Sequence, residues 1–242
     1  MPTDHFGEKV AARYDESSGE QFDSAVIAAT VDFLAGLAGD GTALELGIGT
    51  GRIAVPLAHR GVRVHGIDLS EAMVVRLRAK PGAEEIQVTI ADFATTRVDG
   101  EFSLVYLVFN TIENLTTQDA QVACFQNAAA HLVPGGCFLV EVEVPQLQRL
   151  PPGETARPFH VSPERLGFDE YDVVRQGLVS HHHWLEDGRW QALAMPFRYV
   201  WPAELDLMAR LAGMTLRERF GDWNREPFTA DSTKHVSVWQ KN

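Results

Sequence analysis

The stretch Leu44-Glu45-Leu46-Gly47-Ile48-Gly49-Thr50-Gly51-Arg52 decides the fold of this chain. Residues 42–46 form a short apolar run with one acidic break, which predicts a buried strand, and apolar residues recur at helical spacing from Ile53 onward. Three glycines join the two segments, because a tight turn above a strand end requires backbone angles that glycine adopts freely. Such a turn lets a ligand approach the main chain, and the following helix points its amide groups at that ligand. The sequence therefore predicts a small polar ligand at the three glycines.

The composition favours one large α/β domain that needs no disulfide or metal. The chain has 242 residues and a net charge of −12, and no segment concentrates its 21 basic residues, which argues against a nucleic acid partner. Cys124 and Cys137 lie in apolar segments and are interpreted as buried thiols, as in a reducing compartment. The polar N-terminus and the lack of a long apolar run predict no signal peptide and no membrane partner. We expect a cytoplasmic protein.

Strand and helix patterns alternate along the chain as far as residue 144. Strands that are apolar on both faces predict a parallel sheet with helices on each side. The expected helices before and between them include residues 26–37, 70–77 and 118–132. The expected strands are residues 42–46, 62–67, 86–90, 102–109 and 137–144.

This alternation stops after residue 144. Residues 145–167 contain five prolines and are predicted to form an irregular loop. Three antiparallel strands are expected next, at residues 171–174, 178–185 and 190–199, with a hairpin turn at 186–189. The chain then returns to a helix and two strands. These are expected at residues 202–211, 215–220 and 236–239.

Polar side chains follow the ends of the predicted parallel strands. In a doubly wound sheet, ligands bind beyond the carboxyl ends of the strands. Asp68 ends the second strand, and a carboxylate there accepts hydrogen bonds from both hydroxyls of a ribose. Asp92 follows the third strand and can accept from an adenine amine, while Phe93 and Met73 cover the ring faces. With Asn110 after the fourth strand, these groups indicate an adenosine derivative.

Four sequence blocks in this order resemble the class I S-adenosylmethionine-dependent methyltransferases. The resemblance implies an α/β, Rossmann-like, doubly wound sheet of seven strands in the order 3-2-1-4-5-7-6. It also implies an antiparallel last strand and an antiparallel β insertion after strand five. The cofactor would be S-adenosyl-L-methionine, with S-adenosyl-L-homocysteine as the product. The blocks are Glu45-Leu46-Gly47-Ile48-Gly49-Thr50-Gly51, Gly66-Ile67-Asp68-Leu69-Ser70-Glu71-Ala72-Met73, Ala91-Asp92-Phe93 and Leu132-Val133-Pro134-Gly135-Gly136.

The resemblance also implies a role for each part of the cofactor site. The glycines would approach the methionine moiety, Asp68 would hold the ribose, and Asp92 and Phe93 the adenine. The main chain at residues 108–110 would hold the amino acid end. The expected cofactor-binding residues are Tyr14, Glu45, Gly47, Gly49, Gly51, Asp68, Leu69, Met73, Asp92, Phe93, Phe109 and Asn110.

Within this superfamily, the chain is most similar to small-molecule methyltransferases of bacterial secondary metabolism, the sugar N,N-dimethyltransferases among them. The similarity lies in the segment Ala12-Arg13-Tyr14-Asp15 and in the antiparallel insertion. It divides the chain into a cap, a core and an insertion that forms the acceptor pocket or a dimer contact, so a monomer or a homodimer is expected. The base-modifying amino-methyltransferase signature is absent after the fourth strand, which again disfavours nucleic acid. The divisions are 1–24 for the cap, 25–144 and 200–242 for the core, and 145–199 for the insertion.

Methyl transfer from a sulfonium is an in-line displacement, in which orientation alone lowers the barrier by up to about 7–11 kcal/mol. The reaction needs no fixed triad, so the sequence leaves open whether the small-molecule acceptor uses N, O or S. The catalytic candidates are Tyr14, Glu143, His181 and His183. Each also has a structural interpretation: a packed tyrosine, a surface ion pair, and histidines on a half-exposed strand. A metal at the histidines is disfavoured because a third ligand is lacking.

Two other functions are compatible with some of these sequence features. A nicotinamide-dependent oxidoreductase also uses a glycine turn and an acidic residue after strand two. Its G-x-G-x-x-G pattern, however, requires glycine where this chain has Arg52, and it leaves Asp92-Phe93 unexplained. A non-catalytic cofactor-binding module would keep the same blocks and is distinguished only by the absence of turnover.

Overall fold

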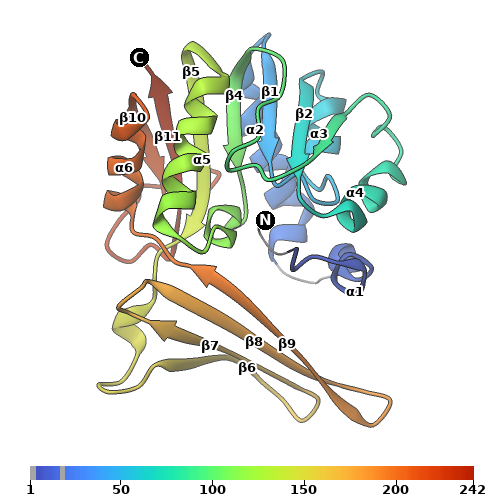
Figure 1. Cartoon of the computed structure of the whole chain (residues 1–242), viewed down its shortest axis with the longest axis vertical. Coiled ribbons are helices and arrows are strands. Elements are labelled where there is room, and N and C mark those ends of the chain that lie inside the picture. The colour runs from blue at the N-terminus through green and yellow to red at the C-terminus, as the bar shows by residue number, and fades with distance from the viewer. Residues whose placement is uncertain (1–3, 17–19) are drawn as a thin grey trace.

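A computed structural model describes residues 4–16 and 20–242 of the chain (Figure 1). Two separate sheets dominate it, a seven-stranded sheet flanked by helices and a four-stranded antiparallel sheet below it in the view of Figure 1. We refer to the four-stranded sheet as the roof sheet. In the part of the chain that the structure describes, no helix is long and apolar enough to cross a membrane.

The seven-stranded sheet has the predicted topology. Its order is β10-β11-β5-β4-β1-β2-β3, and β11 runs antiparallel to both of its neighbours. The expected order 3-2-1-4-5-7-6 is therefore confirmed, since β10 and β11 are the sixth and seventh strands of this sheet along the chain. The strands are β1 (Thr42–Leu46), β2 (Arg63–Asp68), β3 (Gln87–Ile90), β4 (Phe102–Leu107), β5 (Leu132–Glu143), β10 (Met214–Phe220) and β11 (Lys234–Lys241).

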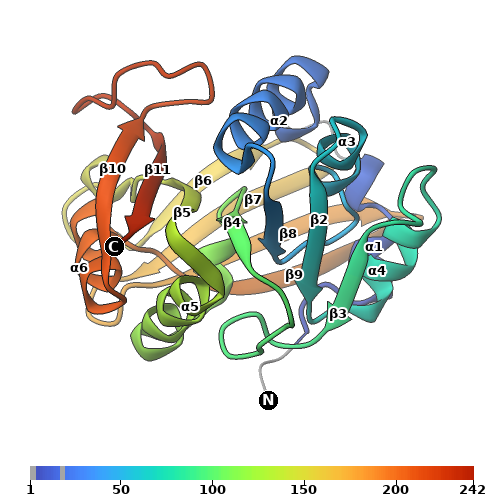
Figure 2. The same cartoon turned by 90° about the horizontal axis from the view of Figure 1, so that it is seen from above.

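Helices cover both faces of this sheet, as the apolar strands predict. Figure 2 shows α2 (Ser24–Ala38) and α3 (Ala54–His59) on one face, with α5 (Gln118–His131) and α6 (Pro202–Leu211) on the other. Two separate hydrophobic clusters correspond to these layers. The remaining core helix, α4 (Glu71–Arg78), begins after Ser70, whose hydroxyl accepts from the Met73 amide at 3.4 Å as a helix cap.

The N-terminal segment packs over the glycine turn. It contains the short helix α1 (Glu8–Ala11) and two 3-10 turns at Tyr14–Glu16 and Glu20–Phe22. The Ser70 hydroxyl donates to the Phe6 carbonyl at 2.8 Å, and the Thr50 hydroxyl donates to Asp15 at 2.6 Å. The cap is thereby attached to the residues that immediately follow β1 and β2.

The roof sheet corrects one prediction. It consists of β6 (Ala156–Val161), β7 (Arg165–Asp172), β8 (Gly177–Glu186) and β9 (Arg189–Arg198), so part of the expected loop at 145–167 is a strand. Pro158 is tolerated because β6 is an edge strand with a register shift between Pro158 and His160. The hairpin turn at 186–189 is confirmed: Asp187 and Gly188 both have positive φ, which suits a two-residue turn.

A buried polar network joins the roof sheet to the core. Arg198, at the end of β9, donates to Glu204 of α6 at 2.7 Å and to Gln121 of α5. Gln176, between β7 and β8, donates to the other oxygen of Glu204 at 2.8 Å. Burial raises the pKa of Glu204, but these hydrogen bonds and the charge of Arg198 outweigh it and lower the pKa below its ordinary value. Glu204 is therefore held as a carboxylate.

Candidate functional site

The glycine turn sits at the carboxyl end of β1. Gly47, Gly49 and Gly51 have φ values of 77°, 55° and 72°, a region that other residues rarely adopt. Packing adds a second constraint, because a Cβ on Gly47 would lie 2.6 Å from the Thr111 methyl and one on Gly51 would lie 2.9 Å from Leu77. Glycine is required here both for backbone conformation and for close packing.

Asp68 ends β2 next to this turn. Its Oδ2 accepts from the Gly49 amide at 2.6 Å, and its Oδ1 accepts from the Ser70 amide at 2.8 Å. Burial raises the pKa of Asp68, while these two backbone hydrogen bonds lower it. Each carboxylate oxygen has a further lone pair, so Asp68 can still accept from the two hydroxyls of a ribose. The donor set at this position therefore fits the predicted cofactor.

The predicted adenine residues lie at the neighbouring strand end. Asp68 pairs with Ile90 of β3, so Asp92 and Phe93 follow at the same edge of the sheet. Asp92 Oδ1 accepts from the Ala94 amide at 2.9 Å, and Phe93 and Met73 are buried. Leu69, between Asp68 and the cap of α4, is half-buried. An apolar wall with a nearby carboxylate is the arrangement that an adenine ring requires.

Tyr14 reaches the glycine turn from the cap. Its ring packs edge-on against Phe6 and Phe22, with centroids 6.4 and 5.6 Å away. Burial raises the pKa of the phenol, the charge of Arg52 lowers it, and the carboxylates of Asp15, Asp68 and Glu45 raise it further. Within residues 4–16 and 20–242, no hydrogen-bond partner of the Tyr14 hydroxyl is found. The hydroxyl is therefore available to a ligand.

Glu45 lies beneath the turn, within β1. Its Oε2 accepts from the Tyr106 hydroxyl at 3.0 Å, and the residue is only 2% exposed. Burial raises the pKa of Glu45 to about 8, although the Tyr106 hydrogen bond and Arg52 lower it. One of its oxygens thus supports Tyr106.

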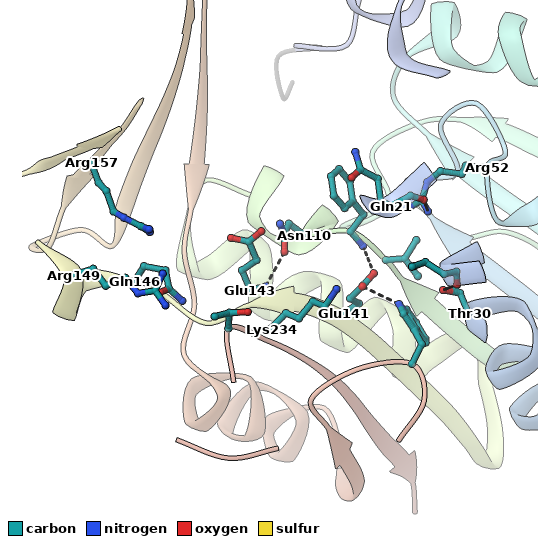
Figure 3. Close-up of a pocket in the computed structure, with 15 residues that line it drawn as sticks. Gln21, Thr30, Arg52, Asn110, Glu141, Glu143, Gln146, Arg149, Arg157 and Lys234 are labelled. Atoms are coloured by element: carbon teal, nitrogen blue, oxygen red, sulfur yellow. Dashed lines mark hydrogen bonds between the residues drawn. The ribbon is translucent and has the colours of Figure 1, made fainter. Parts of the chain in front are cut away.

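A cavity of about 320 Å³ opens at the ends of β4 and β5, between the core, the cap and the first segment of the roof (Figure 3). Charged side chains of both signs surround it. Arg157 reaches from β6 toward Glu143 on the opposite wall (Figure 3). Its lining residues are Gln21, Val26, Thr30, Arg52, Val108, Phe109, Asn110, Glu141, Glu143, Gln146, Arg149, Arg157, Trp223, Thr233 and Lys234.

The backbone is strained where β4 meets this cavity. Phe109 and Asn110 have φ values of 53° and 59°, and a bulky residue such as phenylalanine rarely adopts this conformation. Glu141 holds the strained turn, because its Oε2 accepts from the Phe109 amide at 2.8 Å and its Oε1 accepts from Trp223 Nε1 at 2.9 Å. The Asn110 side chain accepts from the Glu143 amide at 2.8 Å. Strain of this kind concentrates at functional sites.

Glu143 lines the cavity, as its prediction as a catalytic residue requires. Burial raises its pKa, the hydrogen bond with Asn110 lowers it, and the charge of Asp169 raises it again. A carboxyl group with a raised pKa is a stronger base than an ordinary glutamate.

The structure does not bring His181 and His183 to the cavity. Both share a face of the roof sheet with Phe168, whose ring stacks on His181 at a centroid distance of 4.5 Å. His181 Nε2 lies 3.3 Å from a carboxylate oxygen of Glu170. Successive strand residues point to opposite faces, and the face that carries Arg157 toward the cavity carries Asp169 and Ser180 in register. This placement gives no support to the prediction of the two histidines as bases.

Several cavity residues were missed by sequence reasoning. Trp223 lies between β10 and β11, and Lys234 begins β11. Arg149 and Arg157 come from the segment expected to be a loop. None of these residues belongs to a recognisable motif. The only indication in the sequence is that they are polar or aromatic residues close to a predicted strand. No group of three or more His, Cys, Asp or Glu side chains within residues 4–16 and 20–242 is arranged to hold a metal.

Known methyltransferases resemble this chain in sequence and in fold. The methyltransferase domain family matches residues 43–136, which contain the glycine turn, Asp68 and Asp92. The CcbJ methyltransferase from Streptomyces caelestis is 37% identical, with a TM-score of 0.88 over 98% of both chains. A cypemycin N-terminal methyltransferase from a Streptomyces species is 27% identical, and the alignment covers 94% of this chain and 97% of that protein.

Lower identity still preserves the fold. CalS10 from Micromonospora echinaspora, an amino pentose methyltransferase solved with S-adenosylmethionine bound, has a TM-score of 0.72 at 20% identity, covering 96% of this chain and 95% of that one. The nicotinamide-dependent alternative is thus disfavoured, and the predicted fold and enzyme class are confirmed. The chain belongs to the S-adenosylmethionine-dependent methyltransferases with the class I fold.

Proposed function

We propose that this enzyme methylates an amine nitrogen of a small-molecule acceptor held in the cavity between the core and the roof sheet. The observation that carries the proposal is that Phe109, Asn110 and Glu143, at the strand ends next to the cofactor edge, line a cavity of about 320 Å³. A space of that size admits a small molecule or the end of a longer one.

The cofactor residues of this proposal are those of the sequence prediction. Asp68 would hold the ribose, Asp92 with Phe93 and Met73 the adenine, and the strained backbone at Phe109 the amino acid end. S-adenosylmethionine supplies an electrophilic methyl group: an acceptor lone pair forms the new bond to carbon while the carbon–sulfur pair stays on sulfur. The residues of this chain bind and orient the two partners and receive the acceptor proton.

Two polar groups act on the acceptor side in this proposal. The Tyr14 hydroxyl, which has no partner in the described part of the chain, would fix the methionine end and the reacting atoms. Glu143 would accept a proton from the attacking atom, because its raised pKa favours holding one. His181 and His183 take no part, since they lie with Phe168.

Nitrogen is favoured over oxygen and sulfur by two observations. The cypemycin relative, matched along almost its whole length, is named for methylation at an N-terminus. The cavity wall nearest the strand ends bears the carboxylates of Glu141 and Glu143, which attract an ammonium group. Arg149 and Arg157 on the other side suit acidic or carbonyl groups of the rest of the acceptor. We place that acceptor among natural products, as the sequence resemblance implies.

Location and assembly remain expectations of the same proposal. The buried free thiols of Cys124 and Cys137 suit a reducing compartment, which supports a cytoplasmic location. We expect the enzyme to act as a monomer or homodimer without nucleic acid.

The test is a turnover assay with matched acceptors. A panel of amines, each with the alcohol and thiol of the same skeleton, is incubated with S-adenosylmethionine, and S-adenosylhomocysteine and the methylated product are quantified. We expect S-adenosylhomocysteine and the methylated product to form with amines only. Methylation of an alcohol or thiol in preference to its matched amine would contradict the nitrogen assignment. Cofactor binding without turnover across the panel would favour a non-catalytic module.

A further inference from the structure

Three carboxyl side chains from distant segments meet where the roof sheet covers the cavity. Glu143 ends β5, Glu113 lies in the 3-10 turn after β4, and Asp169 lies on β7. Asp169 is in register with Arg157, which places it on the roof face that carries Arg157 into the cavity. The Glu113 amide donates to the Asn110 carbonyl at 2.9 Å, and the Asn110 side chain accepts from the Glu143 amide at 2.8 Å, so Asn110 links the turn to the end of β5. Burial raises the pKa of Glu113, and the charges of Glu143 and Asp169 raise it further, as expected for neighbouring carboxyl groups.

Two largely buried side chains at this cluster have oxygens without a hydrogen-bond partner among the described residues. The Tyr171 side chain is 7% exposed, and the carboxylates of Asp169, Glu143 and Glu113 all act on its hydroxyl. Burial is the largest cause that raises the pKa of Tyr171, to about 12. Among the described residues, neither the Tyr171 hydroxyl nor the Glu113 carboxyl, at 6% exposure, has a hydrogen-bond partner. Neither oxygen is among the fully buried polar atoms that lack a partner in the described part of the chain, so both are accessible to a ligand.

We propose that Glu113, Glu143 and Asp169, with the Tyr171 hydroxyl, form the subsite that binds the acceptor amine as an ammonium and removes its proton. This inference rests on the proposed methylation of an amine. In the step, a nitrogen–hydrogen bond breaks, its electron pair stays on nitrogen, and the proton passes to a carboxylate oxygen. The carboxyl group returns that proton to water after the product leaves.

The surrounding charges favour a cationic ligand. Arg157, and His181 from the opposite face of the sheet, act on Asp169, while Lys234 and Glu141 act on Glu143. With Glu141, the carboxyl groups named here outnumber the permanent cations Arg157 and Lys234. Burial raises the pKa of Glu113, Glu143 and Asp169, so each binds a proton more strongly than an isolated carboxyl group. An arriving ammonium lowers these raised pKa values, since its positive charge favours ionised carboxylates. Amine binding should thus release protons to the buffer.

The experiment compares cyclohexylamine with cyclohexanol, which share a ring and differ in charge. Each is titrated calorimetrically into the full-length protein saturated with S-adenosylhomocysteine, in two buffers of different ionisation enthalpy. We expect the amine to bind at least about tenfold more tightly than the alcohol and to release protons. The double variant Glu113→Gln/Asp169→Asn should lose that preference and keep its affinity for cyclohexanol. Asp40→Asn, an exposed charge before β1, is the matched control and should bind as the wild type.

Thermal melting separates a binding role from a structural one. The double variant should melt at or above the wild-type temperature, because it removes buried carboxyl groups that repel one another. Equal affinity of the two probes for the wild type would overturn the proposal, as would an amine preference that survives the double substitution. Loss of both affinities together with a lower melting temperature would also overturn it, because the groups would then only support the fold.

The outcome is independent of the acceptor panel above. If amines are methylated but the double variant still prefers cyclohexylamine to cyclohexanol, the ammonium subsite is wrong and the proposed function stands. If the preference depends on Glu113 and Asp169 but no amine is turned over, the subsite stands and the proposed function is wrong.

Discussion

At the residue scale, a few side chains combine support of the backbone with free hydrogen-bonding capacity. Asp68 fixes the glycine turn through Gly49 and begins the next helix through Ser70, yet each oxygen still accepts one more bond. Tyr14 is half-buried and packs against aromatic rings, but its hydroxyl has no partner in the part of the chain described. These residues are therefore the sharpest places to test the cofactor site.

Substitution of Asp68 tests the ribose assignment. Asp68→Ala removes a charged acceptor, so we expect S-adenosylhomocysteine binding to weaken by about 1.5–3 kcal/mol. Isothermal titration measures the change, and Asp99→Ala, an exposed carboxylate before β4, is the control. Unchanged affinity in a folded Asp68→Ala protein would contradict the assignment.

Substitution of Tyr14 separates positioning from packing. Tyr14→Phe keeps the ring contacts with Phe6 and Phe22, so stability should change by less than about 0.5 kcal/mol. Turnover should fall at least about tenfold, because the reacting atoms lose a fixed contact. Tyr14→Leu should lower both. If Tyr14→Phe reduces turnover only as far as it reduces stability, the hydroxyl has no positioning role.

Glu45 gives a pH dependence of stability. Its pKa is raised from 4.5 to about 8 by burial, so the folded protein holds a proton in this range that the unfolded chain releases. Glu45 therefore makes stability fall as pH rises between these values, by up to ~1.4 kcal/mol per pH unit. As pH rises through that window, the free energy of unfolding of Glu45→Gln, measured by urea denaturation, should increase relative to that of the wild type. Parallel pH profiles of the two proteins would contradict the buried, protonated state.

At the element scale, the attachment of the roof sheet depends on polar contacts. Arg198 and Glu204 form a buried ion pair, and Gln121, Gln176 and Gln118 complete its hydrogen bonds. Removing one member leaves an uncompensated charge, which is far more costly than losing an exposed pair. This junction fixes the position of β9 and, through the sheet, of the cavity face.

Breaking this junction should lower the stability of the protein. Arg198→Ala is expected to lower the free energy of unfolding by about 3–5 kcal/mol. Arg189→Ala, exposed at the other end of β9, should change it by less than about 0.5 kcal/mol. Denaturant titration of both variants measures this difference, and equal losses would show that the network is not the attachment.

The core sheet could be predicted from local patterns, whereas the roof could be predicted only in part. Strands β1 to β5 alternate with helices except between β3 and β4, and residues such as Gly47 and Asp68 are required by the chain segments next to them. Strand β6 was missed because Pro158 is typical of a loop, although an edge strand tolerates it. His181 and His183 were expected near the acceptor because strand alternation gives two faces without saying which one meets the core.

At the scale of the whole molecule, the site lies between three parts of the chain. Arg52 follows the glycine turn, donates to the Gln21 carbonyl of the cap at 2.7 Å, and lies over the rings of Phe22 and Phe109. Arg13 of the cap pairs with Glu186 at the tip of the roof sheet. Glu113 and Asp169 come from separate regions with no shared pattern, so sequence could not have brought them together.

The most direct test of the account is a crystal structure with S-adenosylhomocysteine bound. We expect the ribose hydroxyls on Asp68, the adenine beside Phe93, and the sulfur facing the cavity lined by Phe109, Asn110 and Glu143. That result would place the transferred methyl group at the mouth of the acceptor cavity. A sulfur atom directed away from this cavity, or a ligand bound elsewhere, would contradict the central claim.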